Sequence, residues 1–257
     1  MKSKNKVAVV TGGSKGIGLG IVEEFISNGT NVLVIARNKE SLAKLKSAYD
    51  PEQIETLIGD VSDTDLPNKA LKIVLSKWGR VDILINNAGG PPADAFLNHD
   101  ESAWMSAFQV NLMSVIRFST TFAPVMKDNN WGRILSITST IAKEPSPIMV
   151  LSATMRAGVA AFNKAISIEL APYNITVNAI CPGGVLTDRL VSLVRSKSMT
   201  DNRPYEDVLK ESENSIPIKR FASVKEIAKT ANFLCSEDGS YITGVQLSVD
   251  GGLSKSY

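Results

Sequence analysis

The sequence predicts an α/β fold in which a parallel β-sheet of about seven strands is covered by helices on both faces. Two patterns support this prediction: short β-branched runs recur along the 257 residues, and segments of helical period lie between them. The runs are continuously apolar, which is typical of strands buried on both faces. Parallel neighbours need long crossovers, and the intervening helices provide them. No linker or shift in composition divides the chain, so we expect one domain over residues 1–257.

The expected elements follow from these patterns, in chain order. Strands are predicted at 6–12, 30–37, 54–60, 81–89, 132–139, 175–183 and 244–252. Helices are predicted at 18–29, 39–49, 66–79, 101–129 and 152–173.

One connection differs from the others. Residues 188–220, between the sixth and seventh strands, are longer, more polar and more charged than the other connections. A segment that follows the carboxyl end of a strand is well placed to close over a ligand as a lid. The alternative is an ordinary pair of solvated helices.

Composition favours small-molecule chemistry. Hydrophobic residues make up 44% and charged residues 21%, with a net charge of +2, which is too small for a strong field that would attract nucleic acid or an anionic membrane. In the basic start "MKSKNKVAVVTGGS", the apolar stretch "VAVV" is too short for a signal peptide or a membrane span. We therefore expect a cytoplasmic protein that binds neither nucleic acid nor membrane.

The cysteines and the histidine predict neither a disulfide nor a metal site. Cys181 and Cys235 lie far apart without a CxxC or Cys/His spacing, so both are expected to be reduced and structural. His99 has no second ligand at metal spacing, which favours an ordinary loop or helix-cap role.

The stretch "VAVVTGGSKGIGLG" places three glycines between a buried strand and an amphipathic helix. Gly12, Gly16 and Gly18 would let the backbone turn tightly and bring a phosphate to the amides and positive end of the helix. A merely structural turn is the alternative, because the spacing is not the GxGxxG of many dinucleotide-binding folds.

Further motifs follow in order: "NNAG" at 86–89, Asn111 in "QVNLMSV", "GRILSITS", "PGGVLT" at 182–187 and the terminal "YITGVQLSVDGG". Together with the glycine-rich turn, they resemble the short-chain dehydrogenase/reductase family, most closely its 3-oxoacyl carrier-protein reductase-like branch. The resemblance covers almost the whole chain. It implies a single Rossmann-type domain, a nicotinamide cofactor, a small carbonyl or alcohol substrate and a homo-oligomer, usually a tetramer.

The resemblance also implies which residues bind the cofactor. The glycine-rich turn would hold the pyrophosphate and ribose, and residues 60–61 would contact the adenine. "NNAG" would line the cofactor cleft, and residues 182–187 would brace the nicotinamide carboxamide. The residues concerned are Thr11, Gly12, Ser14, Lys15, Gly16, Ile17, Gly18, Asp60, Val61, Asn87, Ala88, Gly89, Pro182, Gly183, Val185 and Thr187.

Charge at the end of the second strand indicates which nicotinamide is bound. Ala36 stands where NAD-preferring relatives usually have Asp, and Arg37 follows it, with Lys15 as a second cation in the glycine-rich turn. Arginine attracts the 2′-phosphate of NADP, whereas an acidic residue would repel it. NADP is therefore favoured over NAD; the alternative is that Arg37 is simply a solvated surface residue.

The reaction end departs from the family pattern. Ser139 matches the family's serine and Asn111 its asparagine, but the tyrosine position falls on Ser152 and the lysine position on Arg156. Residues 152 and 156 are one helical turn apart and share a face. Arg156 could still hold the nicotinamide ribose, but an aliphatic hydroxyl is a much weaker acid than a phenol.

Two hypotheses follow. The first is an NADP-dependent oxidoreductase that interconverts a carbonyl and an alcohol through a non-standard proton path. The second is a catalytically weak or inactive NADP-binding sensor or partner subunit.

Overall fold

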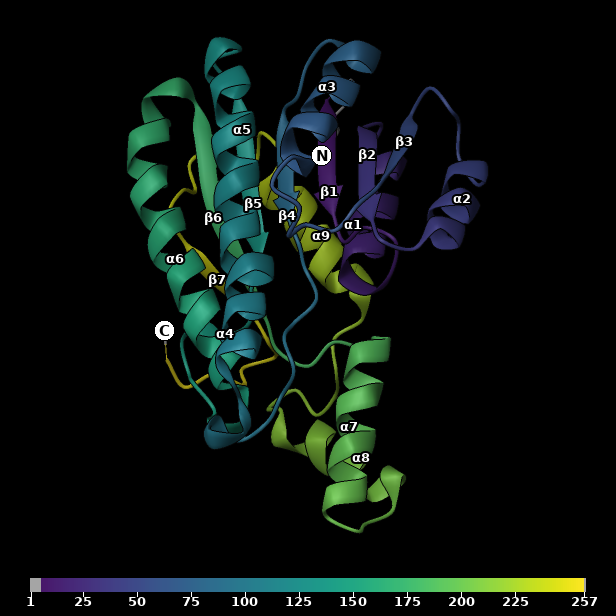
Figure 1. The fold of residues 1–257 in the computed structure, drawn as a ribbon, viewed down its shortest axis with the longest axis vertical. Coiled ribbons are helices and arrows are strands. Elements are labelled where there is room, and N and C mark those ends of the chain that lie inside the picture. The colour runs from purple at the N-terminus through teal and green to yellow at the C-terminus, as the bar shows by residue number, and fades with distance from the viewer. Residues whose placement is uncertain (1–5, 257) are drawn as a thin grey trace.

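The computed structural model describes residues 6–256, so the first five residues of the basic start and Tyr257 lie outside the described part. Its centre is a seven-stranded sheet in the order β3-β2-β1-β4-β5-β6-β7, in which every neighbouring pair is parallel (Figure 1). The predicted α/β fold is confirmed. The strands are β1 (Val7–Thr11), β2 (Asn31–Ala36), β3 (Ile54–Ile58), β4 (Ile83–Asn86), β5 (Gly132–Ile137), β6 (Ile175–Pro182) and β7 (Gln246–Val249).

All seven predicted strands are present, each somewhat shorter than its apolar run, and the five predicted helices are also found. The helices are α1 (Gly16–Ser27), α2 (Lys39–Ser47), α3 (Leu66–Trp78), α4 (Glu101–Phe108), α5 (Ser114–Asp128), α6 (Val150–Leu170), α7 (Asp188–Thr200), α8 (Tyr205–Ser215) and α9 (Val224–Leu234). Short 3₁₀ turns lie at Phe96–Asn98, Thr140–Ala142, Pro147–Met149 and Ala171–Tyr173. Within residues 6–256, no helix is both long and apolar enough to cross a membrane.

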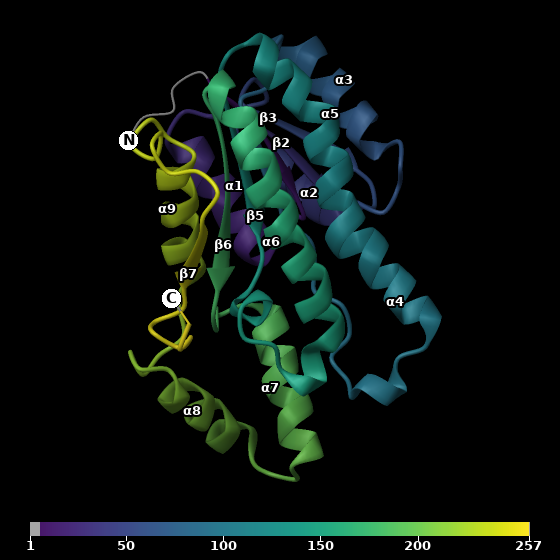
Figure 2. The ribbon, with the colours of Figure 1, turned by 90° about the vertical axis from the view of Figure 1, so that its left-hand side faces the viewer.

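The sheet separates two apolar cores, because successive side chains of a strand point to opposite faces. Ala8 and Val10 of β1 pack in a core with α1, α2 and α9, whereas Val7 and Val9 pack on the other face with α3, α5 and the end of α6. Figure 2 shows α9 on one side of the sheet and α5 and α6 on the other. Burial on both faces explains why the strands read as continuously apolar.

The predicted helix at 101–129 is continuous but changes pitch in its middle. Between α4 and α5, the segment Gln109–Met113 forms a π-helical turn that contains Asn111. Single π-turns inside α-helices are frequently found at functional sites, because they displace one side chain from the regular helical position.

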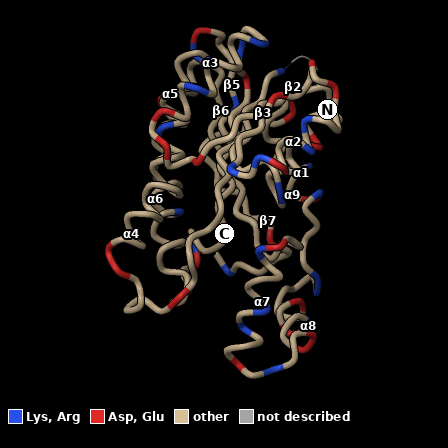
Figure 3. Tube along the Cα trace, turned by 45° about the vertical axis from the view of Figure 1, so that its right-hand side comes forward, with Lys and Arg blue, Asp and Glu red and all other residues tan. Residues whose placement is uncertain are grey.

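The long connection after β6 forms two helices, α7 and α8, that extend beyond the carboxyl ends of the strands (Figures 1 and 2). Val194 of α7 and Val208 of α8 are buried, and Ile216 and Phe221 are buried where the chain returns to the sheet. Both helices contain charged residues of both signs (Figure 3).

Helix α9 was not among the helices expected from the sequence. It begins at a capping box: Ser223 Oγ accepts from the backbone N–H of Glu226, and the Glu226 carboxylate accepts from the backbone N–H of Ser223. The Ser-x-x-Glu pattern is a helix-start signal that could have identified it.

A buried carboxylate fixes the opposite, amino-terminal end of the central strands. Asp82 is fully buried; its side chain accepts a 2.8 Å hydrogen bond from the Val7 N–H and a 2.9 Å hydrogen bond from Nε of Arg80. Lys6 lies 3.7 Å away. The carboxylate thus joins the start of β1 to the residues that lead into β4.

This arrangement predicts that Asp82→Ala lowers the free energy of unfolding by about 1–3 kcal/mol, because the buried Val7 N–H loses its acceptor. Urea unfolding measures the change. Asp65→Ala is the matched control, since Asp65 is exposed and makes only a surface pair with Lys69. Equal effects of the two substitutions would contradict the role of Asp82.

Candidate functional site

A cleft of about 870 Å³ opens at the carboxyl ends of the strands. Its position follows from the strand order. From β1 the chain proceeds to β2 and β3 on one side, and it then returns to β4 on the other side of β1, so the direction in which strands are added reverses between β1 and β4. Ligands of open parallel sheets bind at such a reversal point. The volume is within the usual range for sites that take a whole small molecule.

Reciprocal hydrogen bonds join the end of β1 to the segment that follows β4. Thr11 Oγ1 accepts from the Asn87 N–H at 2.9 Å and donates to the Asn87 carbonyl, also at 2.9 Å. Asn87 Nδ2 donates to the carbonyls of Thr11 and Gly12 at 3.2 and 3.1 Å. These bonds hold the glycine-rich turn against "NNAG", two segments that are 75 residues apart in the chain.

The glycines of the turn serve different purposes. Gly12 and Gly16 have φ of +60° and +52°, a region that other residues rarely adopt. Gly18 has no such φ, but a Cβ on it would lie 2.2 Å from the Gly12 carbonyl oxygen and 2.7 Å from Asn87 Nδ2. Gly18 is therefore required for close packing of the turn, while Gly12 and Gly16 shape it.

The turn and the amino end of α1 form one wall of the cleft. The N-cap residue Lys15 makes no side-chain hydrogen bond to the helix, so its first amides are not capped by a side chain. Such a helix end suits an anion. Residues Gly12, Ser14, Lys15, Gly16 and Ile17 line this wall.

Arg37 and Asp60 lie at the ends of β2 and β3 and also line the cleft. Arg37 is 79% exposed, and its Nη1 lies 3.5 Å from Asp60 Oδ2. The backbone N–H of Ser62, then the Ser62 hydroxyl and Arg37, hold the pKa of Asp60 below its usual range, against the opposing effect of burial. Arg37 thus has an exposed guanidinium beside the adenine end of the expected cofactor.

Ser152 and Arg156 meet on one face of α6, as their spacing predicts. Arg156 Nε donates to Ser152 Oγ at 3.1 Å, and its Nη1 donates to the carbonyl of Ile137 at 3.0 Å. Ser152 is buried, whereas Arg156 reaches the cleft. Burial, and secondarily the repulsion of Arg189, lowers the pKa of Arg156 to about 10, so it stays charged at neutral pH.

Asn111, in the π-turn, points toward the same region. Its Nδ2 donates to the Gly89 carbonyl at 2.8 Å, and its buried Oδ1 has no hydrogen-bond partner among the described residues. A small cavity of about 20 Å³ joins Asn111 to Arg156, Ser114 and Thr138. It is large enough for one water and has the polar walls that a bound water needs.

Ser139 stands at the end of β5, where its Oγ accepts from the Ile141 N–H at 3.3 Å. It does not line the cleft, although its neighbours Ile137 and Thr138 do. Thr138 Oγ1 lies 3.2 Å from Sγ of Cys181. Both cysteines are buried and free, as predicted, and burial raises the pKa of each thiol, that of Cys235 to about 12.

The structure therefore brings most of the expected residues together. Those that do not line the main cleft are Thr11, Gly18, Ser139, Ser152, Pro182, Gly183 and Val185. Thr187 does line it, caps α7 through the Leu190 N–H, and lies beside Gly16. Sequence reasoning missed Gly90, Thr138 and Arg189, which also line the cleft; the position of Arg189 two residues after Thr187 was the available signal.

Comparison with known proteins agrees with this geometry. A family model described as enoyl-(acyl carrier protein) reductase matches residues 12–254. The NADPH-dependent reductase BacG of Bacillus subtilis is 34% identical over 255 residues, which cover 98% of each chain. The 3-oxoacyl-(acyl-carrier-protein) reductase FabG of Chlamydia muridarum is 35% identical over 254 residues, 97% of this chain and 98% of the relative.

A solved structure resembles this chain in both sequence and fold. The crystal structure of YwfH, an NADPH-dependent reductase involved in bacilysin biosynthesis, superposes with a TM-score of 0.93 at 35% identity and covers 99% of this chain and 100% of its own. Fold, cleft and matches together define a Rossmann-type nucleotide-binding oxidoreductase. The chain belongs to the short-chain dehydrogenase/reductase family, within its 3-oxoacyl carrier-protein reductase-like branch.

The packing of the turn predicts that Gly18→Ala lowers the free energy of unfolding by about 1–3 kcal/mol, because the added methyl group forces the backbone apart. Thermal and urea unfolding measure the loss. Gly89→Ala is the control, since a Cβ there meets nothing within 4 Å. If Gly18→Ala is as stable as the parent protein, the close contact with Gly12 and Asn87 is not as tight as described.

Proposed function

We propose that this protein is an NADPH-dependent reductase that converts a carbonyl group to an alcohol without a tyrosine as the proton donor. The observation that carries the proposal is the Ser152–Arg156 pair, in which Arg156 lines the cleft at the reversal point of the sheet and donates a 3.1 Å hydrogen bond to the buried Ser152 behind it. The named relatives that match over nearly full length are reductases, and BacG and the YwfH structure are described as NADPH-dependent.

The cleft residues fit the cofactor. The uncapped amino end of α1 and the glycine-rich turn would hold the diphosphate, with Thr11 shaping the turn through Asn87. Arg37 and Lys15 would bind the 2′-phosphate, and Asp60 with Val61 would flank the adenine. Gly89 and Ala88 would lie along the cofactor, and the segment 182–187 would brace the nicotinamide. When bound, the reduced nicotinamide supplies a hydride.

At the reaction end, the chain would orient the substrate oxygen and supply positive charge. The hydroxyl of Ser139 would donate to that oxygen. Arg156 would hold the nicotinamide ribose with its free N–H groups, because Nε and Nη1 are already engaged by Ser152 and Ile137. Its charge would stabilise the negative charge that develops on the oxygen.

The proton would arrive through water. The Ser152 hydroxyl accepts from Arg156, so its own proton is free to be donated onward. The cavity between Arg156 and Asn111 would hold a water bonded to Asn111 Oδ1, which links the site to the interior side of α4 and α5. Because an aliphatic hydroxyl is a weak acid, this path predicts slower turnover than a phenol would support, by about 10²–10⁴-fold.

We also propose that α7 and α8 act as a substrate lid. Thr187, Asp188, Arg189 and Ser192, at the start of α7, line the cleft, and Arg189 donates to the Pro91 carbonyl in the loop after β4. The proposal extends to a cytoplasmic location and, by family resemblance, a homotetramer. The alternative of a non-catalytic NADP-binding partner subunit is not favoured, because the full-length relatives are named as reductases.

The cofactor assignment predicts that Arg37→Ala raises the dissociation constant of NADPH by about tenfold or more and leaves that of NADH unchanged, because a charge-assisted contact to the 2′-phosphate is lost. Fluorescence titration with each dinucleotide measures both constants. Lys44→Ala, on the outer side of α2, is a control that removes one charge outside the cleft. Equal loss for NADPH and NADH would contradict the assignment.

The proton path predicts that Ser139→Ala lowers kcat/KM by about 10²–10³-fold, since the substrate oxygen loses a hydrogen-bond donor. The loss of Ser139 is measured by NADPH oxidation with the panel of substrates named below.

The proton path also predicts that Ser152→Tyr/Arg156→Lys gains activity, because a phenol is a stronger acid than an aliphatic hydroxyl. Both variants should be assayed by NADPH oxidation with oxoacyl and enoyl thioesters, ketones and oxo acids. Unchanged turnover in Ser139→Ala would remove Ser139 from the mechanism; a double variant and parent protein that are both inactive on the whole panel would support the non-catalytic alternative.

A further inference from the structure

Two arginines from distant parts of the chain converge above one glycine in the cleft. Arg156 comes from α6 and Arg189 from the first turn of α7. A Cβ built on Gly90 would lie 3.8 Å from Nη2 of Arg156 and 3.6 Å from Nη2 of Arg189. Both side chains line the cleft. The two guanidinium groups therefore lie within 4 Å of a common point, at a position with no side chain of its own.

Neither arginine has an acidic partner within residues 6–256. The ion pairs formed among residues 6–256 include neither Arg156 nor Arg189. Their hydrogen-bond acceptors are neutral: the Ser152 hydroxyl and Ile137 carbonyl for Arg156, and the Pro91 carbonyl at 2.9 Å for Arg189. A pair of like charges with only neutral acceptors repels, and burial of one member adds to the cost.

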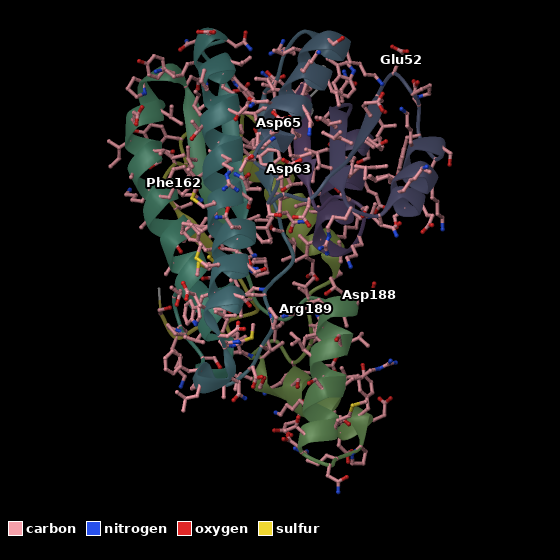
Figure 4. The ribbon with its side chains drawn as sticks, in the orientation of Figure 1. Glu52, Asp63, Asp65, Phe162, Asp188 and Arg189 are labelled. Carbon is pink, nitrogen blue, oxygen red and sulfur yellow. The ribbon has the colours of Figure 1, made fainter. Side chains whose placement is uncertain are left out.

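The surroundings increase this cost. Arg189 occupies the first turn of α7, next to the positive end of the helix dipole, where a cation is unfavourable. Asp188 and Arg189 are both exposed and both line the cleft, but they form no ion pair, and Figure 4 shows them on opposite sides of the turn. Burial lowers the pKa of Arg156, and the charge of Arg189 adds to this effect while Cys181 opposes it. An anion between the two guanidinium groups would offset their mutual repulsion, the burial of Arg156 and the unfavourable position of Arg189 at the start of α7.

The position of the pair favours the substrate as the source of that anion. Its neighbours lie where the reaction is proposed to occur: Gly90 and Pro91 follow β4, Ile137 ends β5, and Ser152 is in the first turn of α6. The amides and cations suited to the cofactor phosphates, at Gly12–Ile17 and Arg37, form the other part of the cleft. Guanidinium groups bind carboxylates well, because two parallel N–H donors match the two oxygens.

We propose that Arg156 and Arg189 bind a carboxylate of the substrate, so that the protein reduces an oxo acid rather than a neutral ketone or ester. This inference rests on the proposed reductase function and specifies its substrate class. Arg189 is the specificity-determining residue, because Arg156 is also assigned to the nicotinamide ribose.

The test compares acids with their esters. The substrates are 2-oxo-4-phenylbutanoate and 4-oxo-4-phenylbutanoate, each beside its methyl ester, with NADPH. We expect the parent protein to prefer the acids, and Arg189→Gln to lower kcat/KM for the acids about tenfold or more, mainly through KM, with less than threefold change for the esters. Arg189→Lys, which keeps the charge, should recover part of the loss.

The control is Arg195→Gln. Arg195 lies on the same helix, stacks over Tyr205 and does not line the cleft, so its removal changes the charge of α7 by the same amount. The acid preference should be unaffected. The dissociation constant of NADPH, measured by titration, should be the same for the parent and both glutamine variants. If Arg189→Gln instead weakens NADPH binding and slows acid and ester equally, the pair binds the cofactor diphosphate and the proposal is overturned.

A binding experiment separates this proposal from the proposed function. The unreactive pair 3-phenylpropanoate and 3-phenylpropanamide is titrated calorimetrically into the complex with NADP⁺. The carboxylate site is supported if the acid binds, the amide does not, and Arg189→Gln abolishes binding of the acid. This result would support the site even if the protein turned over no substrate. Turnover of neutral ketones without discrimination between acid and amide would preserve the reductase and eliminate the carboxylate site.

Discussion

The hydrogen bonds between Thr11 and Asn87 are the contact on which the site depends. At the reversal point of a parallel sheet, two strands end side by side and their following loops turn away in opposite directions. The Thr11 hydroxyl and the Asn87 backbone satisfy each other, and the Asn87 amide satisfies two further carbonyls of β1 and the turn. The loops are thereby held at a fixed separation, and the cleft between them has defined walls.

The same contact explains why the neighbouring positions 12 and 18 are glycine. Gly12 and Gly18 lie so close to Asn87 that neither could carry a side chain without moving it. One loop therefore specifies what the other can contain, and "NNAG" is as much a part of the glycine-rich turn as the glycines themselves. Asn111 extends this network to the helices, since it donates to the carbonyl of Gly89. A short polar chain thus connects the cofactor end of the cleft to the middle of α4 and α5.

Much of the fold could be predicted, because strands buried on both faces and helices of regular period leave strong local signals. The seven strands were found from their apolar runs, and only their ends were placed too far out, where residues such as Asn87 belong to loops. Helix α9 was missed, although Ser223 and Glu226 mark its start. The spacing of Ser152 and Arg156 correctly predicted a shared face, because four residues make about one helical turn.

The rest of the candidate site depends on contacts between distant segments, which local patterns do not encode. Arg189 meets Pro91 across 98 residues, and its approach to Arg156 above Gly90 follows only from the path of α7 after β6. The π-turn at Asn111 was hidden inside a segment whose composition is ordinary for a helix. The unpartnered Oδ1 of Asn111 is likewise a property of the packed interior.

The hydrogen bond from Arg156 to Ser152 makes these two positions a single unit with respect to sequence change. A tyrosine introduced at 152 alone would meet a guanidinium that already occupies the space beside that residue, and a lysine at 156 alone would lose the fork that reaches both Ser152 and the Ile137 carbonyl. Each single exchange removes one partner of this hydrogen bond and leaves the other partner poorly matched. Because the two side chains share a hydrogen bond, the effects of exchanging them are expected to be non-additive, and positions 152 and 156 are expected to change together.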